Sequence, residues 1–587
     1  MRVANTAWWL AALALNCALA SPAPAPTPTP TLILRNADIW TEDEAHPTAH
    51  ALAIAGNRIA KVGSDAEIMK LAGPQTRVLD LHGAFVLPGF IDTHTHFGNA
   101  AESFFEVRLV DVAAEPLLLD RLRTAAREIP ADMWITGFDL GAAAAAHAHR
   151  HGDADFEPFV PSLAEVDRVT PRHPLLLRRY DGAYFMNSRG FELARVDKTT
   201  PDPPNGEYQK DPHTGELTGL LIGSAGVRMS QILPPPSVAR ERIGARAMMH
   251  ELNRYGITSI HDISRIDEIS QTELYHTDVE RSFTNLAIFK DLRARGEMTV
   301  RVYSMLPLAA WKAYPQYGIT PGCGDEMIRY GTLKLLLDSM YMSKPFANNP
   351  DWAGVLSFRI ADAEDAHRDI VGADALGFDT ATHVTGDRGH RMLLDWYEDA
   401  IRVNPARDRR FRLIHAWYPA RAEIERAGRI HAIADIQPSQ LIQELPHLLE
   451  QLGPERAAFA FPWRTMIEQG VRITLGSDWP GSFDRNSVFP LNPLENIYYA
   501  VAREPLGAGS DQRFHIEQAL TVDEAIRAYT LAGAFASRED AIKGSLTEGK
   551  LADVVVLSRN LRKIPLREVP AAKVLYTIFD GRVVYEN

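Results

Sequence analysis

The sequence predicts an α/β protein built on a (β/α)₈ barrel, and three observations support this fold class. Short apolar segments alternate with helical stretches through the middle of the chain, which is typical of parallel βαβ units. Eight of these segments have the length and composition of buried strands, and eight parallel strands close such a barrel. The residues best suited to chemistry fall at the ends of these segments, where such barrels carry their active sites.

The eight expected strands follow one another in the chain with one long interruption after the first. We expect an insertion at about residues 99–249, because removing roughly 150 residues there leaves a barrel of ordinary size. The expected strands are Gly89–His94, Ile257–Asp262, Val300–Met305, Leu333–Asp338, Thr380–Val384, Phe411–His415, Ala432–Gln437 and Arg472–Asp478.

Both ends of the chain that follows the N-terminal leader consist of short strand-like segments. Gly56-Asn57 joins two of them as a hairpin signal. We therefore expect a small β-sandwich domain built from both termini, made of residues 32–87 and 541–587, beside a barrel domain of residues 88–540. The strand-like segments are Thr31–Trp40, Ala51–Ala55, Arg58–Val62, Ala552–Leu557, Val574–Phe579 and Arg582–Tyr585.

Residues 1–20 have the pattern of an export signal. Arg2 supplies a positive start, Trp8–Ala14 is apolar but too short to span a bilayer, and Ala18–Ala20 forms a small-residue cleavage site. Residues 21–31 alternate proline with alanine and threonine, so we expect an extended tether there. The sequence thus predicts export to a bacterial periplasm or to the medium, with no membrane span in the mature chain.

Composition narrows the classes of partner. The 587 residues carry a formal net charge of -13, which argues against nucleic acid or an anionic membrane surface and leaves a small-molecule substrate. Loss of the leader removes Cys17, one of the two cysteines, and leaves only Cys323, so the mature chain cannot form an internal disulfide. Export without disulfides suits a bacterial periplasm and a protein with a large core.

Four histidines and one aspartate at strand ends predict a metal site. His94 and His96 lie two apart on an extended segment, so both imidazoles point the same way. His383 ends the fifth expected strand, His415 the sixth and Asp478 the eighth. Imidazole and carboxylate are the ligands that zinc and related divalent ions take in proteins.

Lys334 is the next residue singled out by the pattern. Alternation along LKLLLD places Lys334 and Asp338 on the face that points into the barrel, where a charged ammonium needs a partner. One interpretation is an ion pair with Asp338. The other is that CO₂ carboxylates Lys334 to a carbamate that bridges two metals, which the five converging metal ligands favour.

This constellation predicts a hydrolase. A bound metal lowers the pKa of water and polarises a carbonyl. Asp478 is placed to orient the attacking water, take its proton and pass it to the leaving group. Fold and metal do not determine the reaction, so an isomerase, a lyase or an ester or lactone hydrolase remains an alternative. A non-catalytic binding protein is the less favoured one, because a binder needs no base beside the metal.

Motifs along nearly the whole mature chain resemble the amidohydrolase superfamily, and more closely amidohydrolase family 3, which includes N-substituted formamide deformylases. The resemblance implies cleavage of a C–N bond, most simply an amide, and a homodimer. It also implies one or two zinc or related ions at the five predicted ligands and a carboxylated Lys334. The motifs are VLPGFIDTHTH (86–96), LNRYGITSIHD (252–262), HVTGDR (383–388), FRLIHA (411–416), IQPS (436–439), LGSDWP (475–480) and GSLTEGKLADVVVL (544–557).

Two segments depart from the pattern of that family. A histidine usually follows the Asp-Gly of the insertion, but YDGAYFMNS has Ala183 there, although Asp181 and Asn187 remain. The segment after Lys334 has Ser339 where the family has glycine. The resemblance implies that both segments border the substrate, so Asp181 and Asn187 are expected substrate contacts.

Three further residues are candidates for substrate binding. Asp387 and Arg388 follow His383 on one loop, and they either bind a substrate carboxylate or brace the loop through an ion pair. Trp479 follows Asp478 and either walls an apolar part of the site or packs in the core.

Overall fold

The protein is described here by a computed structural model, which covers residues 29–142, 144, 157–204, 206–234, 238–263, 284–356, 362–480, 490–508 and 513–587. The expected export signal (1–20) and most of the expected tether (21–31) lie outside these residues. Within these ranges, every helix is too short or too polar to cross a lipid bilayer.

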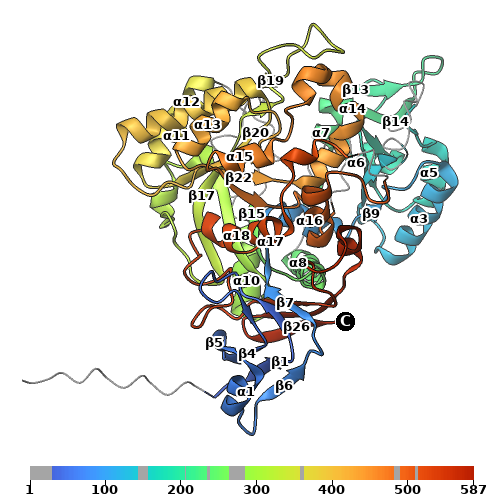
Figure 1. The fold of residues 1–587 in the computed structure, drawn as a ribbon. Coiled ribbons are helices and arrows are strands. Elements are labelled where there is room, and N and C mark those ends of the chain that lie inside the picture. Colours follow the sequence, from blue (N-terminus) through green and yellow to red (C-terminus); the bar gives the residue numbers. More distant parts are fainter. Residues whose placement is uncertain are drawn as a thin grey trace, which may run out of the picture.

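A parallel eight-stranded sheet forms the centre of the molecule (Figure 1). Its strands are β8 (Phe90–Thr95), β15 (Ile257–Ile263), β16 (Arg301–Pro307), β17 (Ile328–Leu336), β20 (Asp379–Val384), β21 (Arg412–His415), β22 (Ile433–Ile436) and β23 (Arg472–Leu475). They pair in chain order from β8 to β23. The predicted barrel is confirmed. β17 begins earlier than expected because Ile328 already pairs with Val302 of β16.

The ring closes just beyond the last paired residues of the first and last strands. The Asp478 backbone N–H donates to the His94 carbonyl at 2.8 Å, and the His96 N–H donates to the Trp479 carbonyl at 2.9 Å. A Cβ at Gly476 would lie 2.7 Å from the His94 nitrogen, so only glycine lets the two backbones approach this closely.

Helices cover the outer face of the barrel. α12 shows why, since Leu393, Leu394, Tyr397 and Ala400 recur at helical spacing and are fully buried against the strands. Leu333 of β17 belongs to the same outer core. The helices are α10 (Thr284–Ala294), α11 (Ala363–Ala375), α12 (Asp387–Val403), α13 (Arg421–Arg429), α14 (Pro438–Ala457), α15 (Trp463–Glu468), α16 (Pro493–Ala502), α17 (Val522–Ala528) and α18 (Leu531–Ala536).

A β-sandwich lies at one end of the barrel and combines the two ends of the chain (Figure 1). One sheet consists of β1 (Leu32–Arg35), β4 (Ala51–Ala55), β5 (Arg58–Gly63) and β6 (Arg77–Asp80). The other consists of β2 (Asp38–Trp40), β3 (Thr48–Ala49), β7 (Phe85–Pro88), β24 (Val554–Leu557), β25 (Val574–Phe579) and β26 (Arg582–Glu586). Alternation divides β24 between two cores: Val554 and Val556 face the sandwich, whereas Val555 and Leu557 face the barrel.

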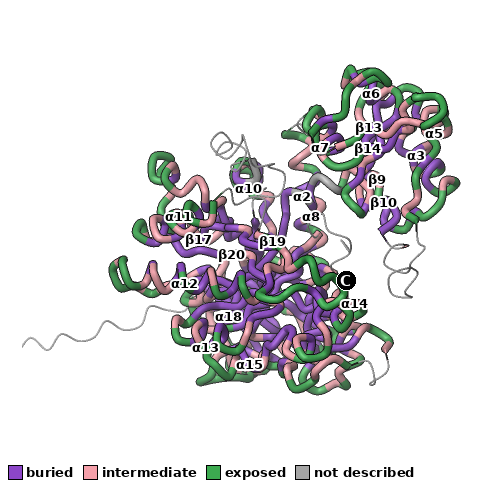
Figure 2. Tube along the Cα trace, turned by 90° about the horizontal axis from the view of Figure 1, so that it is seen from above, coloured by how far each residue is buried: buried purple, intermediate pink, exposed green. Residues whose placement is uncertain are grey.

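The insertion forms a separate lobe, as Figure 2 shows from above. Its sheet has the order β13 (Gly206–Lys210), β14 (Leu217–Gly223), β12 (Tyr184–Met186), β11 (Leu175–Arg179), β10 (Ile135–Leu140), β9 (Val107–Arg108). The helices of the lobe are α3 (Glu115–Glu128), α5 (Leu163–Val169), α6 (Ser188–Ala194) and α7 (Ser224–Ser230). α2 (Phe97–Ser103) and α8 (Val238–Arg254) connect it to the barrel and pack tightly, since a Cβ at Gly244 would lie 2.1 Å from the Ala101 carbonyl oxygen.

A buried ion cluster joins the barrel to the sandwich, and it predicts a large effect on stability. Arg301 of β16 is 1 % exposed and donates to Asp553 at 2.6 and 3.0 Å and to Asp580 at 2.9 Å. Arg301→Leu leaves both carboxylates without their cation, so we expect the free energy of unfolding to fall by about 3–5 kcal/mol in urea titrations.

Lys198→Met is the matched control for this substitution. The Lys198–Glu216 ion pair has a length of 2.5 Å, but both of its side chains are more than half exposed. We expect a change below about 1 kcal/mol for this pair. An equal loss in the two variants would contradict a special contribution from the buried cluster.

Candidate metal centre

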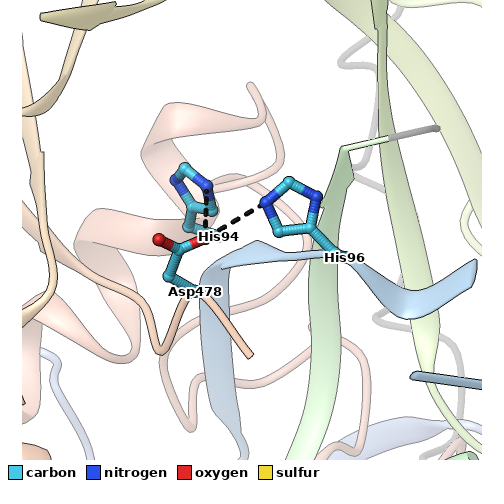
Figure 3. A group of neighbouring side chains, drawn as sticks. All are labelled: His94, His96 and Asp478. Atoms are coloured by element: carbon cyan, nitrogen blue, oxygen red, sulfur yellow. Dashed lines mark hydrogen bonds and ion pairs between the residues drawn. The ribbon is translucent and has the colours of Figure 1, made fainter. Parts of the chain in front are cut away.

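Two histidines and one aspartate converge at the C-terminal end of the barrel (Figure 3). Asp478 Oδ1 lies 3.1 Å from Nε2 of His94 and 3.1 Å from Nε2 of His96. All three side chains are at most 6 % exposed. One ligand atom from each residue lies within 4.8 Å of the others, so the three could hold one cation. Two imidazoles and a carboxylate fit a divalent transition-metal ion.

The other two predicted histidines adjoin this group. The ring centroid of His415 lies 5.1 Å from that of His94 and 4.4 Å from that of His383. His415 is buried, whereas His383 is partly exposed. The structure therefore places all four histidines side by side, with His94, His96 and Asp478 in the tightest arrangement.

An unusual backbone conformation turns His415 towards the metal centre. Along β21, Arg412 and Ile414 face the barrel interior and Leu413 faces the helices, so strict alternation would point His415 outwards. His415 instead has φ 70°, in the left-handed region. Asp478 has φ 59°. Such conformations cost a non-glycine residue of the order of 1–3 kcal/mol, and they concentrate at functional sites.

Lys334 lies in the same group. Its side chain is 4 % exposed, and its positive charge helps to lower the pKa of His94, His383 and His415. Asp338, its expected ion-pair partner, accepts backbone N–H bonds from Tyr341, Thr385 and Gly386 at 2.8–3.0 Å. Burial raises the pKa of Asp338 to about 6, against the effect of these bonds.

The protonation states suit metal binding. Burial, the largest effect, and the charge of Lys334 hold the pKa of His94 and His383 well below the usual histidine range. Burial opposes ionisation of Asp478, but the charge of His94 and hydrogen bonds from His94 and His96 hold its pKa well below the usual range. The lowered pKa values favour the neutral imidazoles of His94 and His383 and the ionised carboxylate of Asp478, which are the forms that bind a metal.

A buried polar network supports the floor of the site. Arg412, which is fully buried, donates to the Thr93 carbonyl at 2.7 Å, contacts His261 Nδ1 at 3.1 Å and forms an ion pair with Asp435. Thr93 Oγ1 donates to the other oxygen of Asp435 at 2.6 Å. These bonds tie four barrel strands together directly beneath the histidines. Sequence reasoning missed Arg412 and Asp435, although both occupy inward positions of predicted strands.

Two glutamines that sequence reasoning did not assign contact the predicted ligands. His415 Nδ1 lies 2.7 Å from Gln437 Oε1 and 3.0 Å from Gln440 Oε1. Gln440 Nε2 donates to Asp478 Oδ2 at 2.9 Å. Gln437 lies within the quoted IQPS motif, which was a usable signal. Gln440 lies one residue beyond it, in the first turn of α14.

Asn187, an expected substrate contact, makes its side-chain hydrogen bonds within the insertion. Asn187 is buried at the N-terminus of α6, and its Oδ1 accepts the N–H groups of Leu175 and Gly190 at 2.9 Å. Its Nδ2 donates to Thr170 Oγ1 at 3.0 Å and to the His173 carbonyl at 2.8 Å. Every polar atom of the side chain is bonded within the insertion, so Asn187 has a structural role.

The remaining substrate candidates are placed as follows. Asp181 pairs with Arg179 at 2.6 and 2.8 Å within the insertion. Asp387 braces the loop by accepting the Ser343 N–H at 2.7 Å, while the Arg388 guanidinium lies 4.4 Å from the centre of the Tyr341 ring. Trp479 is half-buried, packs against the main core and contributes its carbonyl to barrel closure. Among these contacts, the backbone bond from the His96 N–H to the Trp479 carbonyl is the one that reaches the His94–Asp478 group.

A parallel barrel with buried histidines and an aspartate gathered at its strand ends defines the class of metal-dependent hydrolases. Residues 77–585 match the profile of the Amidohydrolase family, and the chain belongs to that family. The family predicted from the motifs is thereby confirmed.

Two curated relatives and one solved structure illustrate the likeness. The chain is 30% identical over 565 residues to Protein LONG AFTER FAR-RED 3 of Arabidopsis thaliana, over 94% of this chain and 91% of that one. It is 28% identical over 576 residues to the N-substituted formamide deformylase of Arthrobacter pascens, over 95% and 98%. Its fold matches an uncharacterized metal-dependent hydrolase from Pyrococcus furiosus with a TM-score of 0.70 and 20% identity, over 91% of this chain and 100% of that one.

The geometry predicts which histidines control metal binding. We expect His94→Ala and His96→Ala each to weaken binding of a divalent ion by more than about 100-fold, because loss of an outer partner alone costs about 10–100-fold. Metal content after dialysis against a graded chelator measures the effect. His46→Ala, with a side chain that is 84% exposed, should bind as the unaltered protein does. Equal metal content in all three variants would contradict the assignment.

Proposed function

We propose that this protein is an exported metal-dependent hydrolase that cleaves a C–N bond, most simply an amide, in a small molecule. The observation that carries the proposal is the position of Asp478, whose Oδ1 lies 3.1 Å from Nε2 of two buried histidines. A carboxylate in this position can contact both a metal ligand set and a reacting water. Membership of the Amidohydrolase family supports the same reading.

The chemistry divides between the ion and the chain. A divalent ion in such a site would lower the pKa of a bound water and polarise the substrate carbonyl. Asp478, held ionised, accepts the proton of the attacking water and returns it to the leaving nitrogen. Burial around His94 and His415 excludes bulk water from this exchange, which strengthens each electrostatic contact.

Zinc is the ion that we propose, because imidazole nitrogen and carboxylate oxygen form its usual ligand sets. We further propose that Lys334 is carboxylated. In this reaction its neutral amine forms an N–C bond to CO₂ and loses a proton, which leaves an anionic carbamate. An ammonium beside three histidines raises the electrostatic cost of binding a cation, as its effect on their pKa values indicates. A carbamate removes that cost and supplies two more oxygen ligands.

The proposed bond type is drawn from the relatives. One relative bears the name N-substituted formamide deformylase, and it shares 28% identity over nearly the whole chain. That name describes cleavage of an amide C–N bond in a small molecule. Ester or lactone hydrolysis, isomerisation and elimination on the same site are the alternatives that an assay must separate.

Export is the second part of the proposal. The positive start, short apolar segment and Ala18-Leu19-Ala20 of the N-terminal leader support it. A periplasmic or secreted location places the substrate outside the cytoplasm. We also propose a homodimer, on the family resemblance.

Amine release is the first test of the proposed function. We expect chelator-sensitive release of amine from at least one member of a panel of N-formyl, N-acetyl and N-acyl-amino-acid amides, detected with an amine-reactive fluorophore. Asp478→Asn should reduce turnover by about 10²–10⁴-fold, the usual contribution of a general acid–base group, while much of the metal remains bound.

The outcomes of this test separate the alternatives. If metal-loaded protein releases no amine from any panel member, the amide assignment fails, and esters, lactones and isomerisable substrates become the next panel. Turnover by Asp478→Asn at the unaltered rate would contradict its role as the base. The His46→Ala variant is the control for nonspecific effects on the preparation.

If Lys334 is carboxylated, its removal should weaken metal binding, and metal binding by the unaltered chain should depend on bicarbonate. Lys334→Ala should lose most of its metal, because the carbamate oxygens are gone. In the unaltered chain, intact-protein mass spectrometry at mildly alkaline pH should detect the added CO₂, and removal of bicarbonate should lower metal content. Full metal retention by Lys334→Ala would overturn the bridging role.

A further inference from the structure

We propose that Gln440 is a positioning residue that aligns Asp478 and His415 for a shared metal ion. The inference rests on the proposed function of the site, and it assigns a task to a side chain outside the ligand set. Gln440 is 3 % exposed and lies in the first turn of α14, where its own N–H donates to the Gln437 carbonyl at 3.0 Å. A rigid helical turn therefore presents its amide to the metal centre.

The orientation of the Gln440 amide follows from its two hydrogen-bond partners, Trp417 and Asp478. Trp417 Nε1–H can only donate, and it lies 2.8 Å from Oε1 of Gln440. On the other side of the amide, Nε2 of Gln440 lies 2.9 Å from Oδ2 of Asp478. A flipped amide would place its NH₂ group against the Trp417 N–H, donor to donor. The oxygen must therefore point to Trp417 and the nitrogen to Asp478.

This orientation determines which nitrogen of His415 carries its proton. Oε1 of Gln440 lies 3.0 Å from His415 Nδ1, and Oε1 of Gln437 lies 2.7 Å from the same atom. Gln437 is oriented in its turn, because its Nε2 donates to the Asp435 carbonyl at 3.2 Å. Two carbonyl oxygens at one ring nitrogen require an N–H there. The lone pair of His415 therefore lies on Nε2, the nitrogen left for a metal.

Gln440 also settles the orientation of Asp478. Its N–H group occupies Oδ2, which leaves Oδ1 turned towards His94 and His96. One amide thus links a ligand on the last barrel segment to a ligand on β21, whereas the contact of Gln437 described above is with His415. In a buried site of low dielectric these bonds are strong, and their loss is costly. Gln437 and Gln440 therefore form a matched pair for experiment.

The test compares Gln440→Met with Gln437→Met in the full-length chain, with the metal alone as the probe. Methionine preserves length and bulk but has no amide. We expect Gln440→Met to bind Zn²⁺ about 10–100-fold more weakly in chelator competition, and its Co²⁺ form to show an altered visible absorption spectrum. Gln437→Met should change both readouts less, because Gln440 still holds His415. Trp417→Phe, which frees the amide to rotate, should have an effect in the same direction.

Two results would overturn the inference. Wild-type Zn²⁺ affinity and Co²⁺ spectrum in Gln440→Met, with unchanged thermal unfolding, would show that Gln440 does not position the ligands. Equal effects of the two methionine variants would show that it acts only through His415. If Gln440→Met fails to fold, Trp417→Phe provides the same readouts. Failure of every amide substrate together with the expected metal defects would refute the proposed reaction and leave the positioning role intact.

Discussion

The union of the first and last strands is the constraint on which the metal centre depends. The backbone bonds that close the barrel join His94 to Asp478 and His96 to Trp479. The ligands themselves therefore lie where the first and last strands meet. Gly476 permits the approach, because a side chain there would strike the His94 backbone. Since closure and ligand placement are one event, the distance between the two histidines and the aspartate is determined by the backbone.

Charge inside the barrel must be balanced, and the structure does this in two layers. Below the ligands, Arg412 and Asp435 neutralise one another, Asp435 accepts the Thr93 hydroxyl and Arg412 contacts Nδ1 of His261. At the level of the ligands, Lys334 and Asp478 bring opposite charges into a group of four histidines. A buried charge is costly unless an opposite charge is paired with it, so each layer balances its own charges in the low-dielectric interior. An added cation changes this balance at the upper layer alone.

The barrel was predictable because its strands are buried on both faces and separated by helices of ordinary length. The ligands were predictable because strand ends meet at one rim, so residue type and position could be read together. Gln440 could not be found this way, since a glutamine in a helical turn has no periodic signal and its partners come from other strands. The orientation of His415 was equally hidden, because alternation points it the wrong way and φ 70° reverses it. The bonds of Asn187 within the insertion were also hidden, because a motif does not show which neighbours fold against a side chain.

The junction of the first and last strands, where His94 and His96 meet Asp478 and Trp479, affects the order of folding and metal binding. His96 and Asp478 are 382 residues apart in the chain, so their meeting is among the latest contacts that synthesis and folding can make. An unfolded chain offers scattered histidines with no common geometry, and metal binding to the closed ring stabilises that ring by mass action. Under the export proposed above, a chain that folds only after crossing the membrane would take its ion from the destination compartment, and the metal supply there would determine which ion the site holds.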